Sequence, residues 1–133
     1  MHRYSFERRA RAEVREVTHI TVEAYAVAGS SEGLMLVHTV YFWLRPELTA
    51  QQHADFINGV GTLAGIKAVE KAFVGRPAKT EKRPIIDDSY SVALTVICKD
   101  IAAHDEYQVD PIHLEFINTF KTFWNRVQIY DAE

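Results

Sequence analysis

One apolar run near the start of the chain constrains the fold more than any other feature of the sequence. The run MLVHTVYFWL, residues 35–44, is rich in β-branched and aromatic residues and predicts a strand. Side chains alternate along a strand, so Leu36, His38, Val40 and Phe42 share one face, and Val37, Thr39, Tyr41 and Trp43 share the other. Both faces are apolar, so each needs a cover. We expect helices on one side and either more sheet or a second subunit on the other.

The next segments predict a helix and two further strands. Thr49 and Gln52 match a capping box, and the apolar stripe that follows indicates a helix. The stripe is His53, Phe56, Ile57, Val60, Leu63 and Ala64, and we expect Gly59, Gly61 and Gly65 to weaken this helix and help end it. A strand follows within residues 67–77 and stops at Pro77. Residues 76–89 form a charged connection, which we expect to be a mobile flap. The strand at residues 89–99 is predicted to place Tyr90, Val92, Leu94, Val96 and Cys98 on one face.

The last third of the chain predicts two helices and a closing strand. Asp100 is a suitable N-cap for a short polar helix, on which we expect His104 to be exposed. Asp110 and Pro111 then begin a second helix, expected to run to about Arg126. Its apolar stripe is His113, Phe116, Ile117, Phe120 and Trp124. Residues 127–131 close the chain as a fourth strand. This order predicts the α+β, ferredoxin-like split β-α-β fold, with an antiparallel four-stranded sheet.

Length and charge exclude several classes of protein. The chain has 133 residues, which suits one globular core, and its net charge of −3 gives no positive field for nucleic acid. No apolar run is long enough to cross a membrane. The single cysteine, Cys98, fits a reducing compartment, so we expect a cytoplasmic protein. Residues 1–34 are less strongly patterned, and we expect an N-terminal extension there, either flexible or adding a strand, before a domain at residues 35–133.

Several of these segments together resemble the stress-responsive A/B barrel (Dabb) family. The resemblance covers residues 35–133 and rests on HTVYFWLRPELT, FVGRPA, SYSVALTVICKD, YQVDPIHLEF and the terminal VQIYD. It implies a homodimer in which two sheets pair to form a barrel. We therefore assign the outward side chains Val37, Tyr41 and Trp43 to the dimer interface.

The resemblance also implies a pocket. A plant polyketide cyclase of this family works without metal or cofactor. In that cyclase a strand histidine, a tyrosine and a helix histidine line the pocket, and the matching residues here are His38, Tyr107 and His113. This chain departs from that cyclase at Asp110, Val92 and Gly59, where pocket histidines or a tyrosine would stand. We therefore do not carry the cyclase reaction over. The expected pocket lining is Val40, Phe42, Val92, Leu94, Phe116, Ile117 and Phe120.

The residues themselves support a pocket around two histidines. His113 falls at the third position of its helix, on the apolar stripe, where the unpaired N–H groups of the helix start oppose protonation. A neutral imidazole there can accept a proton, and the phenol of Tyr107 can hydrogen-bond a carbonyl or an enolate. The alternative is that His38 and His113 are buried histidines satisfied by each other and by the backbone. No ligand spacing indicates a metal site, so we expect neither metal nor cofactor.

Three functions remain open at this stage. The first is binding of a small hydrophobic carbonyl or phenolic compound, with His113, His38 and Tyr107 as candidate catalytic residues. The second is a non-enzymatic stress or assembly protein with a packed interior. The third is a cofactor-independent oxygenase. A cavity that touches both His38 and His113 would favour the first over the second.

Overall fold

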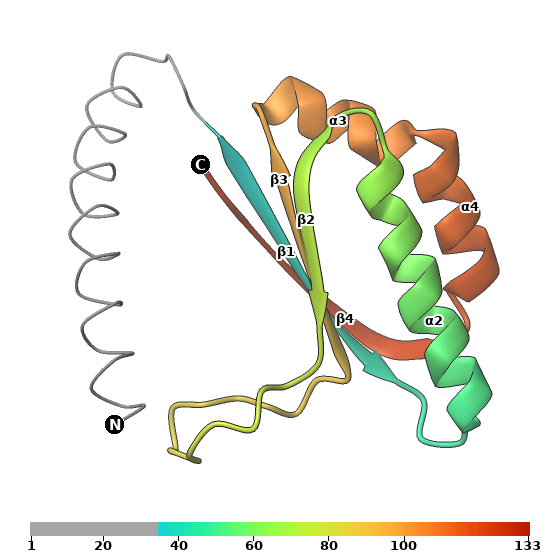
Figure 1. The fold of residues 1–133 in the computed structure, drawn as a ribbon, viewed down its shortest axis with the longest axis vertical. Coiled ribbons are helices and arrows are strands. Elements are labelled where there is room, and N and C mark those ends of the chain that lie inside the picture. The colour runs from blue at the N-terminus through green and yellow to red at the C-terminus, as the bar shows by residue number, and fades with distance from the viewer. Residues whose placement is uncertain (1–34) are drawn as a thin grey trace, which may run out of the picture. The chain divides into compact units, whose positions relative to one another are not determined.

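The structure, a computed structural model, describes residues 35–133 and shows one antiparallel sheet covered by helices (Figure 1). The elements are β1 (Leu36–Leu44), α2 (Ala50–Thr62), the 3₁₀ turn η1 (Leu63–Gly65), β2 (Val69–Gly75), β3 (Val92–Cys98), α3 (Ile101–Val109), α4 (Pro111–Phe120) and β4 (Trp124–Ala132). The strand order is β2-β3-β1-β4, and every neighbouring pair is antiparallel. The predicted α+β, ferredoxin-like fold is confirmed. The extension expected at residues 1–34 lies outside the described residues.

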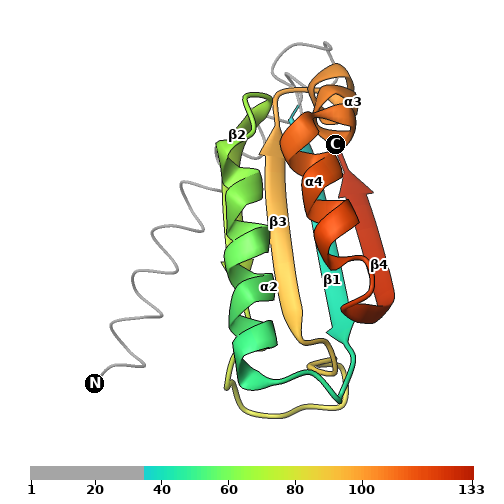
Figure 2. The ribbon, with the colours of Figure 1, turned by 90° about the vertical axis from the view of Figure 1, so that its right-hand side faces the viewer.

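The two faces of β1 have different surroundings. Its buried side chains are those at Leu36, His38, Val40, Phe42 and Leu44, while the four residues between them are only half-buried. Helices α2 and α4 lie side by side on the same face of the sheet (Figure 2). This is the helical cover that the sequence predicted for the inner face.

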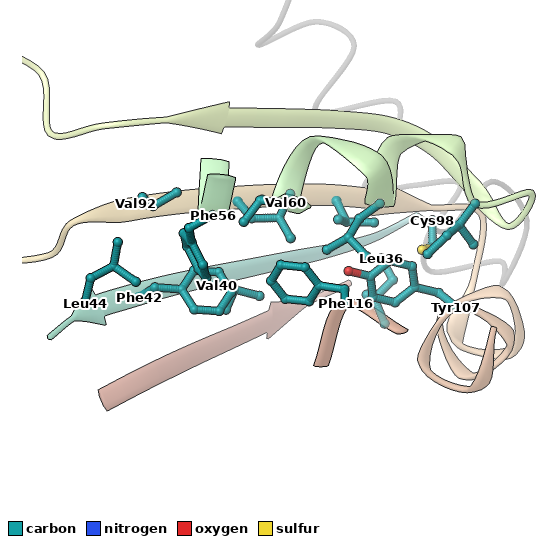
Figure 3. Packing of buried hydrophobic residues seen from close by; sticks show 14 residues of the cluster. Leu36, Val40, Phe42, Leu44, Phe56, Val60, Val92, Cys98, Tyr107 and Phe116 are labelled. Carbon is teal, nitrogen blue, oxygen red and sulfur yellow. The ribbon is translucent and has the colours of Figure 1, made fainter. Parts of the chain in front are cut away.

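An aromatic cluster joins the helices to the sheet. The ring centre of Phe42 on β1 lies 5.1 Å from that of Phe56 on α2 and 6.2 Å from that of Phe116 on α4 (Figure 3). Phe56 is completely buried. Full burial of such a side chain stabilises the fold by about 1.5–3 kcal/mol. The core therefore holds both helices against β1.

Helix α2 runs through two of the three glycines that were expected to weaken and end it. Gly59 and Gly61 both lie within α2, and Gly65 ends the 3₁₀ turn that follows it. A Cβ at Gly59 would lie 2.2 Å from Cε2 of Phe120 on α4, whereas a Cβ at Gly61 would meet nothing within 4 Å. Gly59 thus lets the Phe120 ring lie directly against the backbone of α2.

The predicted end of the last helix is wrong. Helix α4 ends at Phe120, not near Arg126, and Trp124 already belongs to β4. The amide of Phe123 donates to the carbonyl of Phe120, and the carbonyl of Phe123 accepts from the amide of Arg45 just beyond β1. These hydrogen bonds end the helix before Phe123 and start the pairing of the chain with β1. Trp124 still packs in the core, because its ring centre lies 5.3 Å from that of Phe42.

The predicted side of Tyr90 is also wrong. Tyr90 precedes β3, so the strand alternation does not extend to it. Its ring centre lies 4.9 Å from that of Tyr41, on the face of the sheet away from the helices. The end of the charged connection is tied to β1 nearby, because the indole N–H of Trp43 donates to Ser89 Oγ and the Ser91 amide donates to the Phe42 carbonyl.

None of the helices within residues 35–133 is long and apolar enough to cross a membrane.

Candidate functional site

A cavity of about 130 Å³ lies between the inner face of the sheet and helices α3 and α4. It brings together the three candidate catalytic residues, which come from three elements: His38 from β1, Tyr107 from α3 and His113 from α4. The remaining lining residues are mostly apolar: Val40, Phe42, Leu63, Leu94, Gln108, Phe116, Ile117, Trp124, Val127 and Ile129.

The start of α4 places His113 in this cavity. The carboxylate of Asp110 accepts a hydrogen bond from the Ile112 amide and Pro111 opens the helix, so His113 stands in the first turn as predicted. Its Nδ1 is buried and has no hydrogen-bond partner among residues 35–133. A buried polar atom without a partner is rare and costly, which makes it the atom that a bound molecule could best satisfy.

Burial is the main reason why the pKa of His113 lies below its ordinary value. A hydrogen bond to the backbone of Gln108 opposes this shift, and His38 adds a smaller contribution that lowers the pKa. The sequence interpretation had attributed a neutral His113 to the N–H groups of the helix start. The direction agrees but the dominant cause is desolvation. The site therefore presents an uncharged imidazole near neutral pH.

Tyr107 forms the wall next to His113. It is 1% exposed, and its ring centre lies 4.8 Å from that of His113 and 5.7 Å from that of His38. Burial raises the pKa of its phenol far above the ordinary value, so the hydroxyl keeps its proton and can act as a hydrogen-bond donor.

Asp131 fixes the orientation of His38. His38 is 2% exposed, and its Nδ1 donates to Asp131 Oδ1 at 2.5 Å. The two residues are direct partners in the antiparallel pairing of β1 with β4. Sequence reasoning missed Asp131, although pairing the last strand against the first would have placed it opposite His38.

The prediction that His104 is exposed is wrong. Its side chain is 16% exposed, and its ring centre lies 5.0 Å from that of His38. The Nδ1 of His104 lies 3.2 Å from Asp105 Oδ1, and its Nε2 lies 3.2 Å from the side-chain nitrogen of Gln108. His104, Tyr107 and Gln108 are spaced three and four residues apart, so they share a face of α3. That spacing was the sequence signal that could have placed His104 in the site. The helix is polar and has no clear apolar stripe, so the shared face was not recognised.

Two residues expected to line the pocket lie elsewhere. Val92 is buried but stands opposite Phe42 at the start of β3, away from the histidines. Phe120 packs on Gly59 and borders a separate groove between α2 and α4. Val40, Phe42, Leu94, Phe116 and Ile117 do line the cavity. His53 is half-buried on α2 and does not reach it.

Strand β4 contributes apolar lining residues that sequence reasoning did not identify. Val127 and Ile129 share the inner face with Val40 and Phe42, yet they are 40% and 45% exposed. Since β4 is an edge strand, its inner side is less covered than the centre of the sheet. The cavity therefore adjoins a partly exposed apolar strip.

The outer face of the sheet carries an aromatic surface. The ring of Tyr41 contacts those of Tyr90 and Tyr130, and the Arg126 guanidinium lies 4.0 Å from the ring centre of Trp43. Tyr130 is 62% exposed, while Tyr41 and Trp43 are half-buried. Large aromatic side chains on one face of a sheet are typical of a protein interface.

Comparisons with known proteins agree with this architecture. The family model described as "Stress Responsive A/B Barrel Domain" (Dabb) matches residues 36–133. A Dabb family protein with a ferredoxin-like fold from Mesorhizobium loti is 23% identical, with a TM-score of 0.61 over 74% of this chain and 95% of that one. The hydroxynitrile lyase of Passiflora edulis is 17% identical, with a TM-score of 0.64 over 75% of this chain and 93% of the lyase.

A dimeric ferredoxin-like protein of unknown function from Thermobifida fusca is 16% identical, with a TM-score of 0.62 over 75% of this chain and 91% of that one. At such low identities these structures show a shared fold only. No curated protein matches the sequence.

Proposed function

Because this chain belongs to the stress-responsive A/B barrel domain family, we propose that it forms a homodimer whose subunits each bind a small apolar compound carrying a carbonyl or phenol group. The observation that carries the proposal is the unpartnered Nδ1 of His113 beside a largely apolar cavity. Such pockets bind through apolar walls, and a few polar atoms set the orientation of the ligand.

The size of the cavity limits the ligand. A closed apolar cavity of about 150 Å³ holds one benzene molecule. The cavity here, at about 130 Å³, is slightly smaller, so it can enclose at most one ring and not a long chain. A longer compound would have to extend over the exposed apolar side chains of Val127 and Ile129.

The polar groups favour an oxygen-bearing ligand. The neutral imidazole of His113 offers one acceptor or one donor, depending on its tautomer, and the Tyr107 hydroxyl can act as a donor. A phenol can donate to the imidazole, and a carbonyl oxygen can accept from the phenol of Tyr107. His38, held by Asp131, would orient the same compound from the sheet side.

The binding proposal is tested with two probes of similar size, phenol and toluene, titrated by ligand-observed NMR. The wild-type protein should prefer phenol, since only phenol satisfies His113. The His113→Ala variant should lose that preference, and its affinity for phenol should fall about 2- to 12-fold, the equivalent of one net hydrogen bond. The control His53→Ala removes a half-buried histidine away from the cavity and should bind like wild type. Equal binding of phenol and toluene to the wild type would contradict the proposal.

Both His38 and His113 line the cavity. This supports the binding function over the non-enzymatic stress or assembly function, for which we expected a packed interior. No observation favours the oxygenase alternative.

The dimer proposal rests on the aromatic outer face of the sheet. Family resemblance assigns Val37, Tyr41 and Trp43 to the interface, and similar folds from Thermobifida fusca and Bacteroides fragilis are described as dimeric. Sedimentation velocity should show a dimer for the wild type and a monomer for Tyr41→Glu. The control Leu114→Glu changes a side chain that is 50% exposed on α4, and it should remain dimeric. A monomeric wild type would refute this part of the proposal.

A further inference from the structure

We propose that His38, His104 and Asp131 form a binding site for a divalent transition-metal ion, with zinc as the representative ion. Each residue offers one ligand atom, and these atoms all lie within 4.8 Å of one another. The inference goes beyond the proposed function, because binding of an ion needs no compound in the cavity. It also revises the expectation that no metal site exists, since that expectation did not include His104 or Asp131.

The fold brings these residues together from three elements. Strand pairing sets Asp131 of β4 directly opposite His38 of β1. Helix α3 follows β3 across the end of the sheet (Figure 2). It places the ring centre of His104 5.0 Å from that of His38. Since His38 is almost fully buried, its imidazole is fixed in place. The other two ligands have more freedom.

The donor set fits a transition metal. Two imidazole nitrogens and one carboxylate oxygen suit zinc and similar ions, and three protein ligands leave a position open. A magnesium ion would instead require oxygen ligands in a strict octahedron. The chemistry of the three side chains therefore distinguishes between these two ions.

Small side-chain movements would close the site. Zinc bonds to nitrogen and oxygen measure about 2.0–2.2 Å, so the ligand atoms must adjust around the ion. The side chain of Asp131 is 43% exposed, which leaves its carboxylate room to rotate. The side chain of His104 also reaches the surface, at 16% exposed.

A second carboxylate supports the ligand role of His104. Asp105 Oδ1 lies 3.2 Å from His104 Nδ1, which favours the tautomer that carries its proton on Nδ1. The Nε2 lone pair then accepts from the side-chain amide of Gln108, and an ion bound at Nε2 would replace that hydrogen bond. Metal-binding histidines commonly have a carboxylate on the other ring nitrogen, because it fixes the tautomer and orients the ring.

The test is titration of the full-length, tag-free protein with zinc chloride by isothermal calorimetry. Wild-type protein should bind one zinc ion per chain in a saturable step, and magnesium chloride should give no such step. His104→Ala and Asp131→Asn should each weaken the affinity for zinc by at least about 10- to 100-fold. Loss of a residue that only supports a metal ligand already costs about that much, and these two residues would bind the ion directly. Both side chains are partly exposed, so these variants should fold.

Two control variants separate this proposal from the proposed function. His53→Ala and His113→Ala remove histidines outside the triad and should keep the wild-type affinity for zinc. If wild type shows no saturable zinc binding, or if His104→Ala and Asp131→Asn bind zinc as wild type does, the metal site does not exist. Because no organic compound is present, failure of the phenol experiment would not affect this result.

Discussion

Replacing Gly59 by alanine should destabilise the protein, whereas the same change two residues later should stabilise it. Glycine inside a helix is less favourable than alanine by about 0.5–1 kcal/mol. Both Gly59 and Gly61 lie within α2. Nothing lies within 4 Å of a Cβ built at Gly61. We therefore expect Gly61→Ala to raise the free energy of unfolding by about 0.5–1 kcal/mol.

At Gly59 the added methyl group meets the Phe120 ring. It would lie 2.2 Å from Cε2 and 2.7 Å from Cζ, far inside van der Waals contact, so the ring must move. Overpacking of this kind costs about 1–3 kcal/mol. The gain in helix propensity offsets part of that cost. The net destabilisation by Gly59→Ala should be about 0–2.5 kcal/mol, and the two variants should differ by about 1–3 kcal/mol.

Urea denaturation of both variants, at one protein concentration, measures this difference. In thermal unfolding, each kcal/mol should shift Tm by about 4–8 °C for a domain of this size. A double-mutant cycle with Phe120→Ala isolates the contact, since Gly59→Ala should no longer destabilise once the ring is gone. If Gly59→Ala proved as stabilising as Gly61→Ala, the reasoning that α2 and α4 meet through a glycine and a ring would be wrong.

Two further predictions concern the core. Phe56→Ala should lower the free energy of unfolding by about 3–5 kcal/mol, because its ring is completely buried. Leu114→Ala, at a residue on α4 that is 50% exposed, should change it by less than about 0.5 kcal/mol. Urea denaturation measures both, and similar losses would contradict the assigned core. Burial raises the pKa of the Cys98 thiol, so a chromogenic disulfide reagent should react with it only on unfolding, and rapid reaction in native buffer would show that Cys98 is accessible.

Helix starts were predictable because their signals are local. The capping box of Thr49 with Gln52 and the N-caps of Asp100 and Asp110 were read from neighbouring residues and are all present. The end of α4 was not predictable in this way. Trp124 fits a helical stripe by spacing, but hydrogen bonds to the residues after β1 draw it into the sheet. At this boundary the hydrogen bonds of the sheet decide the backbone conformation, although the apolar spacing alone predicts a helix.

The candidate site was predictable only in part for a related reason. His38 and His113 stand on clear apolar patterns, so their inward direction followed from the sequence. Asp131 and His104 have no such pattern around them. They reach His38 through strand register and through the placement of α3, and both depend on residues distant in the chain.

The sequence by itself determined the order of strands and helices and the two-sided apolar character of β1, because alternation and caps act between residues close in the chain. The tertiary structure alone decided which polar side chains meet. It places Asp131 in hydrogen-bond contact with His38 and the ring of His104 next to that of His38. It also leaves Nδ1 of His113 without a hydrogen-bond partner within the described residues. These outcomes follow from register and helix packing, which bring together groups that the chain itself keeps far apart.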